Sequence, residues 1–122
     1  NARAQENHLA AKLASALADY GYTCLRLSDD YNGADLIALR EGEEALHIQL
    51  KGRVTIKPEY MGKGLYMAFP INGDWYVILH DELVEVCGER GYLQTRAWLE
   101  QGKWHVGTPP VAMIERLQEY KV

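Results

Sequence analysis

Two apolar runs separated by a loop of only three residues most constrain how this chain can fold. The runs cover residues 34–40 and 44–51, and each has the length and apolar content of a β-strand. The loop between them contains Gly42, which adopts a positive φ without strain, and a loop this short joins antiparallel neighbours. The sequence therefore predicts a β-hairpin over residues 34–51.

The hydrophobic pattern indicates the register of this hairpin. If Arg40 pairs with Glu44, Asp35 lies opposite Gln49. One face then gathers the apolar side chains of a core, namely Leu36, Ala38, Leu46, Ile48 and Leu50. The other face is polar at its open end, where Asp35, Gln49 and Lys51 come together. A slip of one residue would send Asp35 to the opposite face, so the grouping depends on the short loop.

The rest of the chain predicts helices at both ends and further strands between them. At 122 residues this is one domain, residues 1–122. No clear assignment emerges for residues 88–107, whose aromatic residues we expect to pack as strand or loop. The order of elements predicts an α/β or α+β fold. The expected elements are a helix over 3–20, a strand over 22–28, a turn over 28–33, a polar loop over 52–64, strands over 65–71 and 75–80, a short helix from Asp81, and a closing helix after Pro110 with Val111, Ile114, Leu117 and Tyr120 on one face.

Composition excludes several classes of protein. No apolar run approaches the roughly 20 residues that span a bilayer, and no secretory signal is visible. Cys24 and Cys87 lack metal-ligand spacing and lie in apolar segments, so we expect buried free thiols and a cytoplasmic protein. No P-loop or dinucleotide fingerprint is present, which argues against an organic cofactor. The net charge of −4 counts against a protein that coats nucleic acid nonspecifically.

The open end of the hairpin has the chemistry of a divalent-cation site. Mg²⁺ or Mn²⁺ prefers oxygen ligands, and Asp35 offers a carboxylate, Gln49 an amide oxygen and Leu50 a backbone carbonyl. Lys51 at the same edge would orient an attacking water or stabilise charge on a phosphate. Glu6, on the inward face of the first helix, would complete the site directly or through water. The structural alternatives are that Asp35 caps a turn, Lys51 is solvated and Glu6 favours the helix dipole.

The segment after Lys51 carries a local excess of basic residues on an otherwise acidic chain. Bases and aromatics interleave there, a composition expected for phosphate contacts combined with stacking. We therefore predict that this loop binds the substrate, although a solvated loop or a dimer contact would have the same composition. The residues proposed to contact substrate are Arg53, Lys57, Tyr60 and Lys63.

These residues resemble the motif of the PD-(D/E)XK nuclease superfamily, which includes many restriction enzymes and junction resolvases. Ala34-Asp35 corresponds to the Pro-Asp position, Gln49-Leu50-Lys51 to acid-x-Lys, and Glu6 to an upstream helical glutamate. The helix-strand-strand-strand order also matches, and the resemblance covers roughly residues 3–80. Two positions depart from the motif. Ala34 replaces proline, and Gln49 replaces an acid, which removes one negative charge from the cation site.

The resemblance implies a restriction-endonuclease-like core, with a mixed central β-sheet flanked by helices. It also implies a Mg²⁺-dependent endonuclease of DNA in which Glu6, Asp35, Gln49 and Lys51 are catalytic. A small nuclease that cuts both strands often works as a symmetric pair, so a homodimer is expected. One alternative is an inactive nuclease-fold module that binds nucleic acid or a protein partner. Another is an interaction protein whose polar hairpin end is merely solvated.

Overall fold

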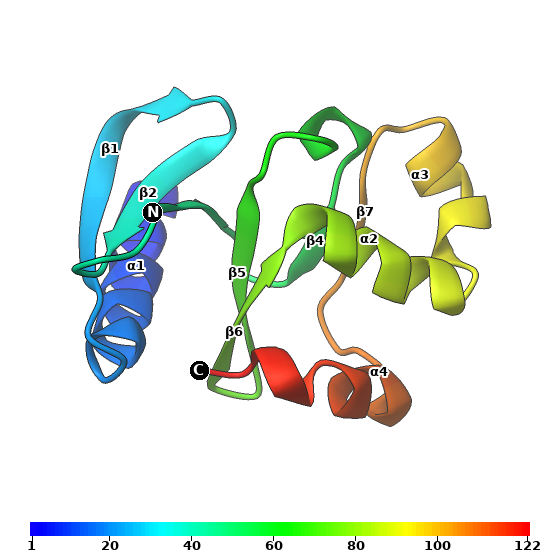
Figure 1. The fold of residues 1–122 in the computed structure, drawn as a ribbon. Coiled ribbons are helices and arrows are strands. Elements are labelled where there is room, and N and C mark those ends of the chain that lie inside the picture. The colour runs from blue at the N-terminus through cyan, green and yellow to red at the C-terminus, as the bar shows by residue number, and fades with distance from the viewer.

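The computed structural model describes residues 1–122 and contains four α-helices and seven β-strands (Figure 1). The helices are α1 (Ala2–Ala18), α2 (His80–Glu89), α3 (Arg96–Leu99) and α4 (Val111–Arg116). The strands are β1 (Thr23–Tyr31), β2 (Ala34–Leu39), β3 (Leu46–Leu50), β4 (Val54–Ile56), β5 (Tyr66–Ile71), β6 (Asp74–Leu79) and β7 (Trp104–Val106). Short 3₁₀ turns lie at Pro58–Tyr60, Tyr92–Gln94 and Gln118–Tyr120. None of the helices combines the length and hydropathy needed to cross a membrane.

The main sheet is mixed, and it has the strand order β1-β2-β3-β5-β6. Strands β3 and β5 run parallel, whereas the other neighbours are antiparallel. A parallel pair needs a crossover connection, and here the crossover contains β4, which pairs with β7 in a separate two-stranded sheet. Helices flank the main sheet, so the expected α+β fold class with a mixed central sheet is confirmed.

The hairpin of β2 and β3 has the predicted register, with Leu36 opposite Ile48 and Ile37 opposite His47. The preceding turn is shorter than the predicted 28–33 turn, because β1 continues to Tyr31. Asn32 and Gly33 adopt φ values of 52° and 93°, which close a two-residue turn between β1 and β2. The strand predicted to end at residue 28 is therefore longer than expected.

Helix α1 covers one face of the sheet. Asn1 begins the helix as its N-cap, because its side-chain oxygen accepts a hydrogen bond of 2.8 Å from the Ala4 N–H. Apolar residues of α1 then pack on the predicted core face of the β2–β3 hairpin. This first core includes Ala10, Leu13, Leu17, Leu36, Ala38, Ile48 and Leu50. Burial of this apolar stripe is the main term that holds α1 to the sheet.

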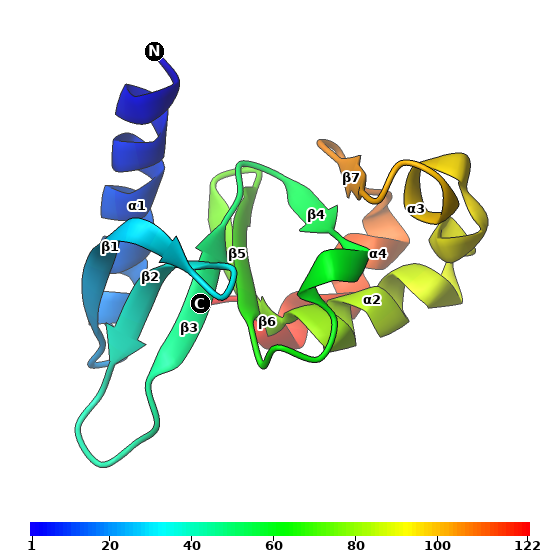
Figure 2. The same ribbon diagram turned by 90° about the horizontal axis from the view of Figure 1, so that it is seen from above.

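A second core covers the opposite face mainly over β5 and β6, and it also includes Ala34 at the start of β2, with Leu27 of β1 packed against it. Side chains of these strands, among them Met67, Phe69 and Ile78, pack against α2, α4 and the small β4–β7 sheet. Figure 2 shows these elements gathered on the side of the molecule away from α1. Farther from this core, the face of β1 and β2 opposite α1 is uncovered, and Leu25 and Leu39 are exposed there. Asp35 lies at the start of β2, at the end of the sheet, where residues of α1 and β1 are also close.

Three sequence-based expectations are wrong in this half of the molecule. Residues 52–64 are not simply a polar loop, because β4 lies within them and both Val54 and Ile56 are fully buried. In the segment 88–107, Trp98 lies in helix α3 and not in the expected strand or loop, whereas Trp104 lies in β7, the partner of β4. The predicted face of the closing helix is wrong at Val111, which is 71% exposed, and Met113 is buried in the second core beside the predicted Leu117. Packing against α2 and β6, rather than intrinsic periodicity, selects the buried face.

The two cysteines are both free, and they lie in different environments. Cys87 is fully buried in the second core, whereas Cys24 on β1 is partly exposed. Burial raises the pKa of the Cys87 thiol to about 12 and also raises the pKa of the Cys24 thiol. Neither thiol is therefore activated as a nucleophile.

Candidate active site at the open end of the hairpin

Asp35 and Gln49 lie side by side at the open end of the β2–β3 hairpin. The Gln49 amide Nε2 donates a hydrogen bond of 3.1 Å to Asp35 Oδ2. The Leu50 N–H donates to both carboxylate oxygens of Asp35, at 3.1 and 3.3 Å. The carboxylate is therefore held in one orientation by a backbone donor and a side-chain donor from the neighbouring strand.

The Gln49 amide nitrogen faces two of the oxygens that were predicted as cation ligands. Besides Asp35 Oδ2, it approaches the Leu50 carbonyl oxygen at 3.4 Å. The Gln49 amide group thus donates to both the Asp35 carboxylate and the Leu50 carbonyl, the two oxygens that a small cation would contact. The donor chemistry fits Mg²⁺ or Mn²⁺, since a carboxylate and a carbonyl are hard oxygen ligands. The amide oxygen joins this set only if the amide rotates, and no cluster of three His, Cys, Asp or Glu side chains is available to hold a metal.

Burial perturbs the acid–base chemistry of Asp35. Loss of hydration raises the pKa of its carboxyl from 3.8 to about 6, and the nearby Glu6 adds to this rise. The Leu50 N–H and the charges of Arg26 and Lys51 oppose it. Asp35 is thus a partly desolvated carboxylate with too little positive charge around it. A bound cation would compensate for that deficit, and perturbed groups of this kind are frequent at functional sites.

Lys51 lies next to Asp35 at the end of β3. Its backbone N–H donates to the Ala68 carbonyl at 2.9 Å, which ties the residue to β5. Burial lowers the pKa of its ammonium group, and the positive charges of Lys57 and Lys103 lower it further. Asp35 acts in the opposite direction. Lys51 therefore stands in the electrostatic field of both the carboxylate and a group of neighbouring cations.

Glu6 is exposed on α1 and faces the same cavity as Asp35. This cavity of about 380 Å³ lies between α1, β1 and β2 and is lined by Arg3, Glu6, Asn7, Arg26, Leu27, Ser28, Asp30 and Asp35. Arg26 Nη1 donates a hydrogen bond of 3.0 Å to Asn7 Oδ1, which joins α1 to β1 at this point. The structure thus brings Glu6 to the site without a direct hydrogen bond to Asp35 or Gln49.

The four residues predicted to bind substrate have separate locations. Arg53 lies with Lys51 at a basic cavity. Lys57 forms an ion pair with Glu59 at 3.4 Å, and Lys63 is exposed in the turn that follows. Tyr60 requires a correction, because it is only 8% exposed and packs edge-on against the ring of His80. Its ring is part of the second core and is not available for stacking on a base.

His80 and its neighbour Asp81 hold the crossover segment in place. His80 is buried, and its Nε2 accepts a hydrogen bond of 3.1 Å from the Lys57 N–H. Its Nδ1 lies 3.1 Å from Asp81 Oδ1, and Asp81 Oδ2 accepts from the Gly62 N–H at 3.0 Å. Burial lowers the pKa of His80, so the neutral ring that accepts from Lys57 is favoured. This pair has a structural role in positioning residues 57–62.

The sequence analysis missed Lys103 and His105, which line the same cavity as Lys51 and Arg53. Both belong to the unassigned segment 88–107. They flank Trp104, which is buried, so the local pattern alternates polar and apolar residues as a strand does. That alternation was a usable signal for β7, but it spans only three residues.

The sequence matches no protein-family model and no curated protein. Two solved structures resemble the fold at low sequence identity. A Holliday junction resolvase, Hjc, from Archaeoglobus fulgidus is 14% identical with a TM-score of 0.48, over 62% of this chain and 72% of the other. A bacterial homing endonuclease, I-Ssp6803I, is 12% identical with a TM-score of 0.49, over 93% and 89% of the two chains. Because both TM-scores lie below 0.5, any functional assignment must come from the site itself.

Proposed function

We propose that this chain is a single-domain, divalent-metal-dependent endonuclease of the PD-(D/E)XK type that hydrolyses phosphodiester bonds of DNA. The observation that carries the proposal is the pairing of Asp35 with Gln49 on adjacent strands, with Lys51 next to them. This arrangement resembles that of the motif, with Gln49 at the position of the acid. The raised pKa of Asp35 supports a role beyond capping a turn, because a desolvated carboxylate benefits from a bound cation.

In this proposal Asp35 and the Leu50 carbonyl hold the cation, and Gln49 adds its amide oxygen after the amide has rotated. Rotation is needed because the amide nitrogen now faces both other ligands. Mg²⁺ or Mn²⁺, when bound, would lower the pKa of a water and neutralise charge on the phosphate. The remaining positions would be filled by water, which Mg²⁺ usually retains. A single carboxylate implies weak metal affinity.

Lys51 would act on the reacting phosphate directly. Its ammonium group is partly desolvated, so its charge is less screened than that of an exposed lysine. It would orient the attacking water or stabilise the negative charge that develops on the phosphate. Glu6 would act from the opposite side through the shared cavity with Asp35, by holding a water molecule. Arg53, Lys57 and Lys63 would contact the DNA backbone.

We further propose that the enzyme works as a homodimer. The uncovered face of β1 and β2 supports this, because Leu25 is 50% exposed and Leu39 is 41% exposed there. Leu25→Asp should abolish a dimer formed through this face, and Val111→Asp, at an exposed apolar residue on α4, is the matched control. Light scattering after gel filtration would measure the change in mass. A wild-type chain that is monomeric at all concentrations would contradict the dimer.

The test of the proposed activity is a cleavage assay on supercoiled, linear, branched and single-stranded DNA with Mg²⁺ or Mn²⁺. We expect cleavage by the wild type and none by Asp35→Ala. Asp29→Ala is the control, because Asp29 is an exposed carboxylate on the neighbouring strand β1. Binding of DNA without cleavage of any substrate would instead identify a nuclease-fold binding module. If the protein neither binds nor cleaves DNA, the interaction protein is the remaining explanation.

A further inference from the structure

The small β4–β7 sheet has one apolar face and one basic face. Val54, Ile56 and Trp104 alternate into the second core. Because Thr55 is directly opposite His105 in the antiparallel pair, their side chains share the other face. Arg53 precedes Thr55 by two residues, and Lys103 precedes His105 by two residues. Because side chains alternate along a strand, both point to the same face as Thr55 and His105. All the ionisable side chains along this face are basic.

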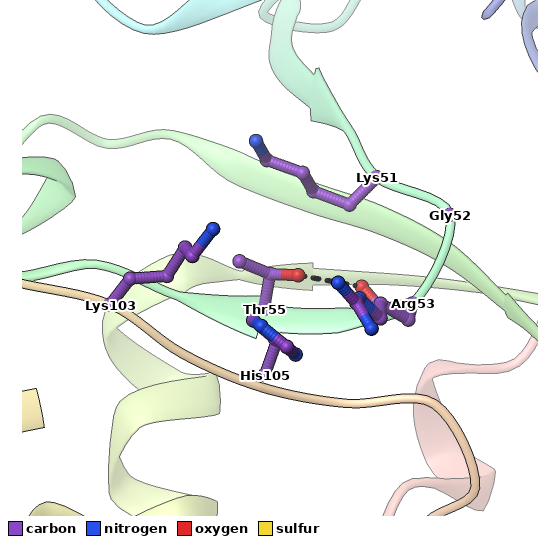
Figure 3. Close-up of a pocket in the computed structure, with 6 residues that line it drawn as sticks. All are labelled: Lys51, Gly52, Arg53, Thr55, Lys103 and His105. Carbon is purple, nitrogen blue, oxygen red and sulfur yellow. Dashed lines mark hydrogen bonds between the residues drawn. The ribbon is translucent and has the colours of Figure 1, made fainter. Parts of the chain in front are cut away.

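This basic face forms one wall of a cavity of about 360 Å³ (Figure 3). The cavity is lined by Lys51, Gly52, Arg53, Thr55, Lys103 and His105, and none of these is an apolar side chain. In Figure 3 the side chains of Lys51 and Lys103 extend from different elements toward the region above Thr55. Two segments distant in sequence thus contribute to it: residues 51–55, which lead from the end of β3 into β4, and residues 103–105 at β7.

No carboxylate forms an ion pair with the cations of this cavity. The side chains of Lys51, Arg53 and Lys103 take part in none of the ion pairs of the molecule. Burial lowers the pKa of His105, and the charges of Arg53 and Lys103 lower it further. The cations therefore repel one another in the free protein. An anion placed among them would relieve that repulsion, which is the physical basis of an anion site.

We propose that this cavity binds a phosphate group of a nucleic-acid backbone, next to the phosphate that is cleaved at Asp35. That the cavity binds an anion is argued from the cavity alone. That this anion is a DNA phosphate next to the cleaved one rests on the proposed function. Lys51 belongs to both places, because it lines the cavity and also feels the charge of Asp35. The lining carries the three cations Lys51, Arg53 and Lys103 and no apolar side chain, so we assign the contact to a backbone phosphate, which carries no sequence information.

The first arm of the test measures DNA binding without metal, so that the Asp35 site contributes little. Fluorescence anisotropy with a labelled duplex in EDTA would give Kd at several salt concentrations. We expect Lys103→Ala to weaken binding about fivefold to tenfold at low salt. The slope of log K against log salt should fall by about 0.9, the value for one lost phosphate contact. Lys12→Ala, which removes the same charge from an exposed position on α1, is the control.

The second arm uses inorganic phosphate as the probe and NMR resonances of the His105 ring as the readout. Phosphate should shift these resonances in the wild type and shift them less in Lys103→Ala. Circular dichroism would verify that the variant is folded. If Lys103→Ala binds DNA as the control does, the cavity proposal is wrong while the nuclease remains. If phosphate shifts His105 but no DNA binds, the ligand is free phosphate, and both the backbone assignment and the proposed nuclease fail. If neither probe binds, the anion site is absent.

Discussion

The open end of the β2–β3 hairpin and the basic face of the β4–β7 sheet differ in how their charges are satisfied. At the hairpin end, Asp35 accepts hydrogen bonds from Leu50 and Gln49, and the nearest positive charges only partly offset its burial. On the basic face, Lys103 and Arg53 have no carboxylate partner at all. The comparison teaches that charged side chains can gather at one site without opposite charges beside them to compensate their charge. In our proposals a cation would compensate the charge of the hairpin end, and an anion would compensate the charge of the basic face.

Lys51 connects the two regions, and its removal should have the largest effect. Lys51→Ala is expected to lower kcat for DNA cleavage about 100-fold, because one preorganised charge at the reacting phosphate is lost. It should also weaken DNA binding in EDTA by a few-fold. Lys51→Arg keeps the charge, so it should restore binding but only part of the cleavage, since the guanidinium places its donors differently. Cleavage by Lys51→Ala at the wild-type rate would contradict the link between the regions.

Gln49→Glu should change the hairpin end alone. A second carboxylate next to Asp35 adds the negative charge that the motif normally supplies, so we expect the affinity for Mn²⁺ to rise about tenfold. Isothermal titration calorimetry would measure it, with Gln5→Glu on the exposed surface of α1 as the control. The salt dependence of DNA binding in EDTA should change little. Unchanged Mn²⁺ affinity would show that the cation does not bind between these two side chains.

Lower pH should weaken metal binding at the hairpin end through Asp35. With a pKa of about 6, its carboxyl is mostly ionised at pH 7.5 and mostly protonated at pH 5.5. Proton competition alone therefore predicts a loss of Mn²⁺ affinity of about fourfold over this interval. The groups that affect this titration are Glu6, Arg26 and Lys51. Mn²⁺ titrations at both pH values would detect the change, and pH-independent affinity would argue against Asp35 as the ligand.

The smallest expected effect is on stability. Because the folded state raises the pKa of Asp35 from 3.8 to about 6, the folded chain holds its proton more tightly than the unfolded chain. The ionised form therefore destabilises the fold at neutral pH, and this penalty disappears as pH falls through 6 toward 3.8. Asp35→Asn should raise the free energy of unfolding by about 1 kcal/mol at pH 7, after allowance for partial solvent exposure. Urea denaturation at pH 7 and at pH 4 would test it, with the gain absent at the lower pH.

Local patterns predicted the first half of the molecule well. The connection is longer than the predicted loop of residues 41–43, because β2 ends at Leu39 and β3 begins at Leu46, but the predicted register that places Leu36 opposite Ile48 is confirmed. The same register places Asp35 next to Gln49. These features follow from the chain alone, because a hairpin is a contact between neighbours in sequence and a shift of one residue would expose the core face. Asn72-Gly73 likewise marks the turn between β5 and β6, with Asn72 at a φ of 52°.

The second half shows where local patterns are insufficient. Tyr60 lies among basic residues and was expected at the surface, but it is buried against His80, which lies twenty positions further along the chain. β4 and β7 are three residues each, and neither is recognisable until the other lies next to it. Val111 fits the periodicity of the closing helix, yet it is exposed, whereas Met113 outside the predicted face is buried together with the predicted Leu117.

The sequence by itself determined the hairpin, its register and the grouping of Asp35, Gln49 and Lys51, since each depends on residues close in the chain. Only the tertiary structure decided that the Gln49 amide nitrogen points at Asp35 and that burial raises the pKa of the carboxyl. It also decided that Lys103 and His105 join Arg53. Hydrogen-bond direction, desolvation and the pairing of distant strands depend on the packed surroundings, and no spacing along the chain specifies them.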